Sequence, residues 1–172
     1  MFLSRGQKIL FYGGLDPVRK QRFHGFSPGD IAGTFNSDKI FPEWWGLIPN
    51  QNEIAINCAI SSLLGSVSGH TISLASGTYY VSGPIDLRAS LSYLAGASSG
   101  STFIVATKDW SAKFENSTYW SNHAKIDPES HAAMIWIGSA VPANQSFRTG
   151  VRGLTVSAYE ASKKHRDKKI SC

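Results

Sequence analysis

Acidic side chains are the first candidates for chemistry in this sequence. Asp86 and Asp109 lie near turns, and Asp127 and Glu129 stand two residues apart in a polar stretch. A glycosidase needs two carboxylates placed across one sugar bond. Carboxylates this close together in a polar loop are more often simply solvated, and neither a Gly-rich phosphate loop nor a nucleophile elbow is present. We therefore assign no catalytic residue.

Metal ligation is the second chemistry to consider. His123 and His131 flank the two carboxylates, but their spacing fits no zinc pattern. Cys58 falls within an apolar helical pattern, which is typical of a small buried side chain, and Cys172 is the last residue. We assign no metal-binding or cofactor-binding residue and expect no cofactor.

Aromatic side chains mark the polar stretch 107–133, which we expect to be a loop that protrudes from the domain. Trp110, Tyr119 and Trp120 lie in it among Lys, Asn, Ser and His residues. Such rings can stack on a sugar or fill a protein interface, so these three are our candidate glycan or partner contacts. The alternative is that they anchor the loop onto its own domain.

The first 44 residues differ from the rest of the chain. Gly and Pro residues break this segment into short pieces, and aromatic residues are scattered between them. A segment of this kind suits docking onto another protein, and packing on its own domain is the equally weighted alternative. The candidate docking residues are Phe11, Tyr12, Phe23, Phe26 and Phe41.

A helix is predicted over residues 50–64. Asn50 is the expected N-cap, and Glu53 follows three residues later, as in a capping box. The next apolar residues repeat at helical spacing and give one apolar stripe, which must cover something because so short a helix is unstable alone. Gly65 is the expected stop. The stripe consists of Ile56, Ala59, Ile60, Leu63 and Leu64.

After Gly65 the apolar pattern changes from helical spacing to short β-type runs. Runs rich in β-branched and aromatic residues occur at 71–74, 78–81, 85–87, 91–94 and 102–106. Glycines separate these runs, but no Asn-Gly or Asp-Gly hairpin turn joins them, which favours parallel coils over antiparallel hairpins. Regular structure is expected to resume at 134–137, and then at Val151 and at 154–156.

Charge sets the ends of the chain apart from its middle. The net charge is +5, and residues 159–172 hold five Lys and Arg residues against Glu160 and Asp167. This basic tail suits binding to phosphate groups, and a solvated terminus is the plainer alternative. No run of 18 apolar residues occurs, so we expect no membrane span.

The ordered series of motifs resembles the pectate-lyase-like β-helix domain found in polysaccharide-degrading enzymes and in bacteriophage tailspikes. The resemblance covers residues 45–107 and 134–158, about half of the chain. Two departures are the replacement of the family's acidic loop by residues 47–52 and the presence of Ala75 where proline is usual. The matching pieces are Trp45-Gly46, Ala55-Ile56-Asn57-Cys58-Ala59-Ile60, Leu74-Ala75-Ser76-Gly77-Thr78-Tyr79, Pro84-Ile85-Asp86-Leu87, Leu94-Ala95-Gly96, Thr102-Phe103-Ile104 and Gly150-Val151-Arg152-Gly153-Leu154-Thr155-Val156.

This resemblance implies a mainly β fold: a short, truncated right-handed parallel β-helix with an N-terminal capping helix and an extended N-terminal arm. The expected parts are a docking arm at 1–44, the β-helix start at 45–158 and a basic tail at 159–172. The family has many more coils than this chain has room for. Its catalytic residues usually lie on those later coils, so none is carried over.

The function expected from the resemblance is structural: a tail fibre or tailspike-like subunit located in a phage virion. It implies a homotrimer, other tail proteins bound through the arm, and host surface polysaccharide as a further partner. One rival hypothesis is a polysaccharide lyase or glycoside hydrolase, a depolymerase acting on host surface glycans. Another is a module that binds glycans without cutting them.

Overall fold

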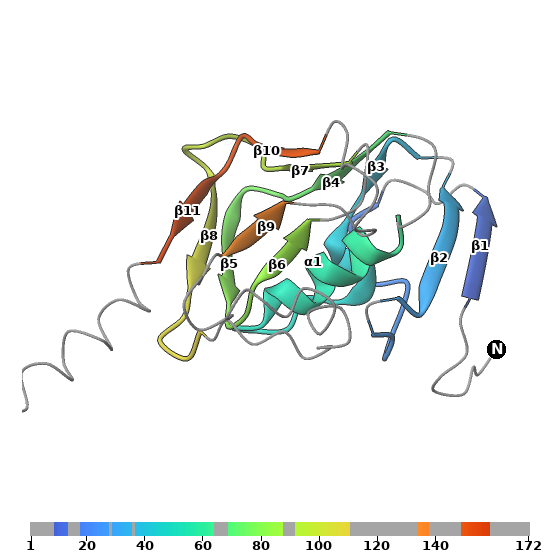
Figure 1. Ribbon diagram of the computed structural model, residues 1–172, viewed down its shortest axis with the longest axis horizontal. Coiled ribbons are helices and arrows are strands. Elements are labelled where there is room, and N and C mark those ends of the chain that lie inside the picture. The colour runs from blue at the N-terminus through green and yellow to red at the C-terminus, as the bar shows by residue number, and fades with distance from the viewer. Residues whose placement is uncertain are drawn as a thin grey trace, which may run out of the picture.

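A computed structural model describes residues 9–13, 18–27, 29–35, 37–63, 69–87, 92–110, 134–137 and 149–158 (Figure 1). Its N-terminal elements are β1 (Ile9–Gly13), β2 (Ile31–Phe35), β3 (Lys39–Ile40), the 3-10 helix η1 (Pro42–Trp45) and α1 (Asn52–Ser61). The strands that follow are β4 (His70–Ser73), β5 (Gly77–Val81), β6 (Ile85–Leu87), β7 (Ser92–Ala95), β8 (Thr102–Ala106), β9 (Ile135–Ile137), β10 (Gly150–Arg152) and β11 (Thr155–Ser157).

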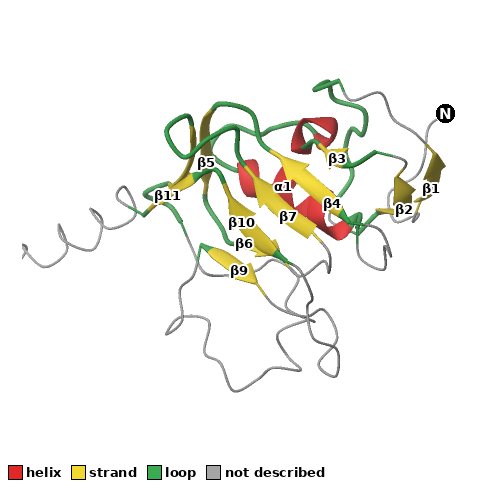
Figure 2. Ribbon diagram, turned by 90° about the horizontal axis from the view of Figure 1, so that it is seen from above, coloured by secondary structure: helices red, strands yellow, loops and turns green. Residues whose placement is uncertain are grey.

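Within these ranges every strand pairing is parallel, as the sequence predicted. One sheet has the order β10-β7-β4-β3, a second β11-β8-β5 and a third β6-β9, while β1 and β2 form a separate pair. From β4 onward, consecutive strands belong to different sheets, and each strand pairs with the one three elements later. Figure 2 shows α1 beside these sheets, with β1 and β2 to one side.

Side chains that point inward stack in register from strand to strand. In one sheet Ile40 pairs with Ile72 and Ile72 with Leu94, and all three are fully buried. In the next sheet Tyr79 pairs with Ile104, again in the core. Because side chains alternate across a strand, a register shift of one residue would expose each of these columns.

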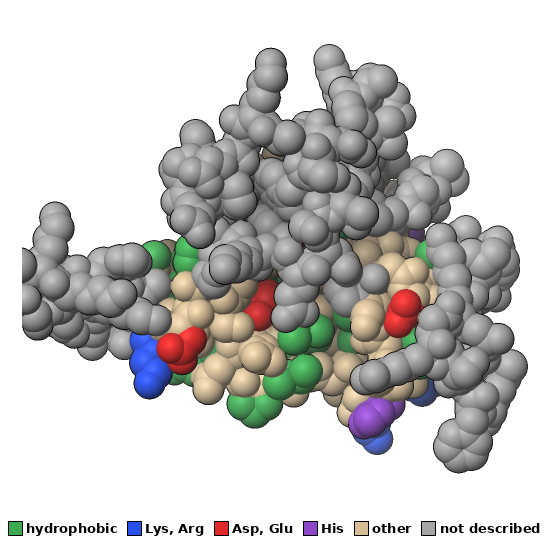
Figure 3. Space-filling model, turned by 60° about the horizontal axis from the view of Figure 1, so that its bottom comes forward, with side chains coloured by type: hydrophobic (Ala, Val, Ile, Leu, Met, Phe, Trp, Pro, Cys, Tyr) green, Lys and Arg blue, Asp and Glu red, His purple; other side chains and the backbone are tan. Residues whose placement is uncertain are grey.

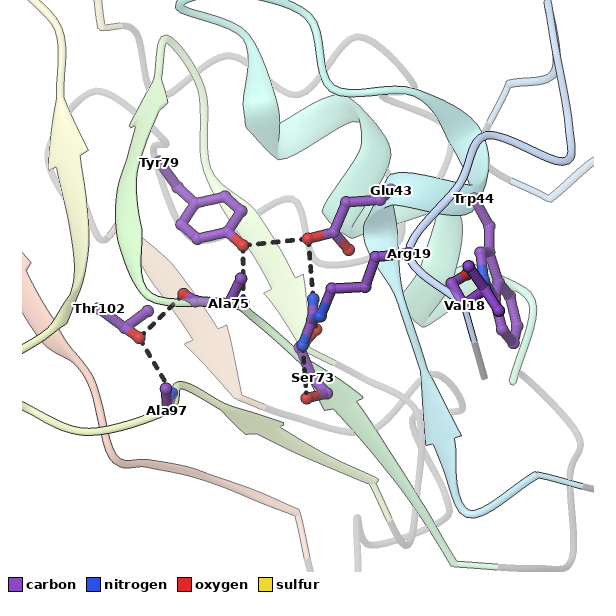
Figure 4. A network of polar contacts seen from close by, with 9 residues as sticks. All are labelled: Val18, Arg19, Glu43, Trp44, Ser73, Ala75, Tyr79, Ala97 and Thr102. Atoms are coloured by element: carbon purple, nitrogen blue, oxygen red, sulfur yellow. Dashed lines mark hydrogen bonds and ion pairs between the residues drawn. The ribbon is translucent and has the colours of Figure 1, made fainter. Parts of the chain in front are cut away.

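The turns that lead from one sheet to the next are stabilised by the Thr102 hydroxyl and pack closely at two glycines. Thr102 donates a hydrogen bond to the carbonyl of Ala75 at 3.0 Å and accepts one from the amide of Ala97 at 2.9 Å (Figure 4). At the next corner a side chain on Gly96 would collide with the backbone of Gly153, whose own φ is +61°. Glycine at both positions lets the two turns lie close together.

The predicted capping of α1 is wrong. The helix begins at Asn52, its N-cap is Gln51 without a side-chain hydrogen bond, and Asn50 has a left-handed φ of 63°. The carboxylate of Glu53 accepts hydrogen bonds from Ser82 instead of closing a capping box. The Glu53 carboxylate thus accepts from a residue far along the chain, and not from the helix N-terminus as a capping box would require.

The apolar stripe of α1 is buried as predicted, but burial extends further round the helix. Ile56, Ala59, Ile60 and Leu63 are at most 2% exposed, whereas Leu64 and Gly65 lie outside the described residues. Ala55 and Cys58 are buried as well, and α1 contacts β2 and η1 in addition to β4, β5 and β6. The helix therefore lies between the strands and the N-terminal segment.

Several aromatic side chains of the N-terminal segment pack on its own domain. Phe41 is 5% exposed and meets Trp44 edge-on, with ring centroids 5.6 Å apart. Phe23 and Phe26 pack against the core, and Phe23 lies 5.0 Å from Trp45. These contacts are of the kind expected when the segment packs on its own domain, and docking onto another protein stays a prediction. The other two candidates, Phe11 and Tyr12, lie in β1, and their side chains are outside the described set.

Two isoleucines in the β6-β9 sheet allow a matched test of this core. Ile85 is fully buried, while Ile137 is 53% exposed. We expect Ile85→Ala to lower the free energy of unfolding by about 2–5 kcal/mol, because it leaves a cavity among packed side chains. Ile137→Ala should change it by less than about 1 kcal/mol. Equal losses in urea unfolding of the two variants would contradict the assigned core.

Candidate functional site

Three polar side chains of α1 point at the backbone of β5 and β6. The Asn52 amide, oriented with its oxygen toward the strand, accepts a hydrogen bond from the Tyr80 amide and donates one to the Ile48 carbonyl, both at 3.0 Å. The Glu53 carboxylate accepts from the Ser82 amide at 3.1 Å and from its hydroxyl at 2.8 Å. These contacts fix the first turns of the helix on the strands.

Asn57 extends the same row of contacts by one helical turn. Its amide donates to the Pro84 carbonyl at 3.0 Å and accepts from the Asp86 amide at 2.9 Å. The backbone groups that α1 binds thus belong to residues 80, 82, 84 and 86, every second residue along the β5–β6 segment.

The backbone groups of the odd-numbered residues in this segment face the other way. The Gly77 amide donates to Ser101, the Val81 carbonyl accepts from Thr107, and the Ile85 amide donates to Met134, all in segments at β8 or β9. Backbone groups of alternate residues lie on opposite edges of a strand, so α1 occupies the edge where a preceding strand would pair. Its side chains satisfy groups that would otherwise be left without partners.

A second polar cluster ties the N-terminal segment to β4 and β5 (Figure 4). Arg19 forms an ion pair with Glu43 at 2.8 Å and also donates to the carbonyl and the hydroxyl of Ser73, at 2.9 and 3.0 Å. Its guanidinium lies 4.3 Å above the ring of Phe41. The Tyr79 hydroxyl donates to Glu43 at 3.3 Å and accepts from the Ala75 amide at 2.8 Å. We call Arg19, Glu43, Ser73 and Tyr79 the clasp.

Burial raises the pKa of two side chains, Tyr79 in the clasp and Cys58 in α1. It raises the pKa of Tyr79 to about 12, with the negative charge of Glu43 acting in the same direction. It also raises the pKa of Cys58 to about 12, helped by the charge of Asp30. A thiol that is protonated at neutral pH is a poor nucleophile. Burial therefore favours structural roles for Tyr79 and Cys58.

Among the candidate glycan contacts, only Trp110 falls in a described range. It follows β8, is partly buried and packs against the core, which agrees with an anchoring role. Its indole nitrogen is buried and has no acceptor among the described residues. Tyr119, Trp120, Asp127, Glu129, His123 and His131 lie outside the described residues.

The structure also places the remaining acidic candidates. Asp86 lies in β6, where Asn57 binds its amide, and Asp109 lies in the turn after β8. Sequence reasoning missed Asn52, Asn57 and the clasp as positioning residues. A signal for the first two existed: they are polar residues in a helix whose other residues are mostly buried.

The described residues show neither a metal-binding cluster nor a membrane-spanning helix. Nowhere in those ranges do three His, Cys, Asp or Glu residues gather as a metal site would require. No helix that the structure describes combines the length and the apolar character needed to cross a membrane.

No family model, curated protein or solved structure matches the chain.

Replacing Asn57 tests the contact row along β5 and β6. We expect Asn57→Ala to lower the free energy of unfolding by about 1–3 kcal/mol, because it leaves buried backbone groups without partners. The control is Gln51→Ala, an exposed N-cap without a cap hydrogen bond, which should cost less than about 0.5 kcal/mol. An Asn57→Ala variant as stable as the control in urea would show that α1 does not serve this edge.

The raised pKa of Tyr79 predicts a loss of stability at alkaline pH. The folded chain favours the neutral phenol, so this contribution is complete below the ordinary pKa of 10.0 and disappears as the pH rises toward about 12. Urea unfolding between about pH 9.5 and about pH 11.5 should therefore show a steeper decline for the parent chain than for Tyr79→Phe. Cys58 is present in both chains, so its own titration cancels in the comparison. Parallel declines would refute the assignment.

Proposed function

We propose that the chain is a structural component of a phage tail, the start of a tail fibre or tailspike-like subunit. The observation that carries this proposal is the parallel three-strand repeat, closed at its first edge by α1 and β3. This arrangement supports the right-handed parallel β-helix implied by the family resemblance. A closed first coil suits an element that starts a long, rigid fibre.

The positions of the motifs support the same reading. The Ala55–Ile60 motif lies within α1, and the motif ending at Tyr79 leads into β5. The 84–87 motif contains β6, and the 94–96 motif overlaps the end of β7. The 102–104 motif opens β8, and the last motif spans β10 and most of β11. These pieces of the resemblance thus fall on successive elements in chain order.

The proposed subunit associates with itself, as a homotrimer, and with other tail proteins through its N-terminal segment. Leu47, Ile48 and Tyr80 are large apolar residues that are 40–44% exposed, and Asn52 bridges the backbones of the last two. Neighbouring exposed apolar side chains favour a protein contact. On the face seen in Figure 3, hydrophobic side chains reach the surface in small groups among polar ones.

Locating the chain in virions tests this proposal. We expect the purified chain to sediment as a trimer, and antibodies against it to label the tails of phage particles that encode it. Leu47→Asp combined with Ile48→Asp should shift the trimer toward monomer, while Val18→Asp, at a comparably exposed apolar residue, should not. A monomeric chain that labels no part of the particle would exclude this function.

Enzymatic activity is the outcome that favours the rival hypothesis. The chain would be incubated with capsular polysaccharide from the phage host and the polymer length followed. Shortening that Asp127→Ala and Glu129→Ala abolish would make the chain a depolymerase. Polymer of unchanged length is expected of a structural subunit.

A further inference from the structure

Residues 18–27 precede β2 and belong to no helix or strand. The amides of Arg22 and Phe23 both donate to the carbonyl of Trp44 in η1, at 2.7 Å. The outer side of the segment is open to solvent, since the side chains of Lys20 and Arg22 are exposed. We call residues 18–27 the strap, because they lie along the domain surface and are held from one side.

The strap covers part of α1. The Cys58 thiol donates to the Phe26 carbonyl at 3.7 Å, and the Phe26 ring packs against the core. Cys58 is 2% exposed, and Asp30, shortly after the strap, helps to raise its pKa. Movement of the strap away from α1 would therefore give solvent and reagents access to this thiol.

Arg19 joins the strap to the strands. Its guanidinium binds Glu43 of η1 at 2.8 Å, and it donates to the carbonyl and the hydroxyl of Ser73 in β4 at 2.9 and 3.0 Å. A charged group with several directed contacts holds a segment more firmly than a neutral hydrogen bond does. Arg19 is thus the side chain whose loss should loosen the strap most.

The closed strap leaves one buried polar atom without a partner. Oε1 of Glu43 accepts from both Arg19 and the Tyr79 hydroxyl, whereas Oε2 is buried and has no hydrogen-bond partner among the described residues. A buried acceptor in this state is unfavourable because it has lost its water. Withdrawal of Arg19 would let water reach the carboxylate, which lowers the free-energy cost of opening.

We propose that the strap opens as a unit while α1 and the sheets stay folded, with Arg19 as its latch. Gly25 and Gly29 have φ values of +76° and +92°, and a side chain on either would meet nothing within 4 Å, so the chain is free to turn there. Segments with an exposed side and few buried contacts open locally at low cost. Opening uncovers Cys58 and the side of α1 around it. This inference concerns a motion within one chain and holds whether or not the chain belongs to a phage tail.

The Cys58 thiol provides the readout. The full chain with Cys172→Ser, the parent for this experiment, has Cys58 as its one thiol and is mixed with an aromatic disulfide, dithiobis-nitrobenzoate, at about pH 8. The Cys58 thiolate attacks the reagent's disulfide, forms a mixed disulfide and releases coloured thionitrobenzoate. Burial raises the pKa of this thiol to about 12, so the closed strap keeps it protonated and slow to react. We expect a labelling rate that depends little on low urea concentrations, since strap opening exposes little surface.

Three substitutions in the parent locate the latch. Arg19→Met keeps the alkyl stem but removes the guanidinium contacts, and it should raise the labelling rate at least about tenfold. Lys20→Met, at the exposed neighbouring cation, should change the rate less than about twofold. Ile85→Ala destabilises the whole fold but leaves the strap contacts in place. Its labelling rate without urea should therefore stay within about twofold of the parent's.

Three results would overturn the proposal. One is a parent labelling rate that follows global unfolding at every urea concentration, because Cys58 would then react only in the unfolded chain. Another is equal labelling of Arg19→Met and Lys20→Met. The third is an Ile85→Ala variant that labels as fast as Arg19→Met. If Arg19→Met folds poorly by circular dichroism, the urea dependence of the parent decides alone. These readouts do not depend on the trimer or virion experiments, so the two proposals can fail separately.

Discussion

The backbone of the β5–β6 segment imposes the constraint on which the rest of the structure depends. Its odd-numbered residues are paired with segments at β8 and β9, and the backbone groups of Tyr80, Ser82, Pro84 and Asp86 must find partners on the opposite side. A buried backbone group without a partner costs about 1–3 kcal/mol. An apolar helix would cover the core but leave these groups unsatisfied. The polar residues of α1 are placed so that one helix provides both the apolar cover and the hydrogen bonds.

This double task explains why the N-terminal segment folds back onto the domain. The apolar stripe and the polar row of α1 face the strands, which leaves Ala55 and Cys58 on another side of the helix. Both residues are nevertheless buried, so something other than these strands covers them. The N-terminal segment lies against α1 there: η1 and β2 contact the helix, and the Cys58 thiol donates to the Phe26 carbonyl at 3.7 Å. The clasp then fixes the segment to the strands, since Arg19 joins Glu43 of η1 to Ser73 of β4. An ion pair that is part of a hydrogen-bonded network on a half-buried surface gains more than an isolated exposed pair.

Sequence reasoning succeeded where the signal was local and periodic. The apolar stripe of α1, the parallel pairing and the approximate spans of β4 to β11 all follow from residue spacing and from the absence of hairpin turns, whereas β1, β2 and β3 were not predicted. It failed where a residue's partner lies far along the chain. Glu53 matches a local capping pattern, yet it binds Ser82, 29 residues away, and Arg19 binds Ser73, 54 residues away. The positive φ of Asn50 was also hidden, because a left-handed Asn fits a turn as readily as its side chain fits a cap.

The two ends of the ladders differ in chemistry, and this difference gives the domain a direction. At the first edge, α1 and β3 satisfy the strands, so further strands cannot add there without unfolding the helix. At the last described strands, Val156 and Ile137 are about half exposed, whereas their partners on the preceding strands, Ile104 and Leu87, are fully buried. A parallel stack closed on one side can grow on the other side alone, because each added strand must bring its own inward column into register. The helix that stabilises the fold therefore also decides where the domain can be extended.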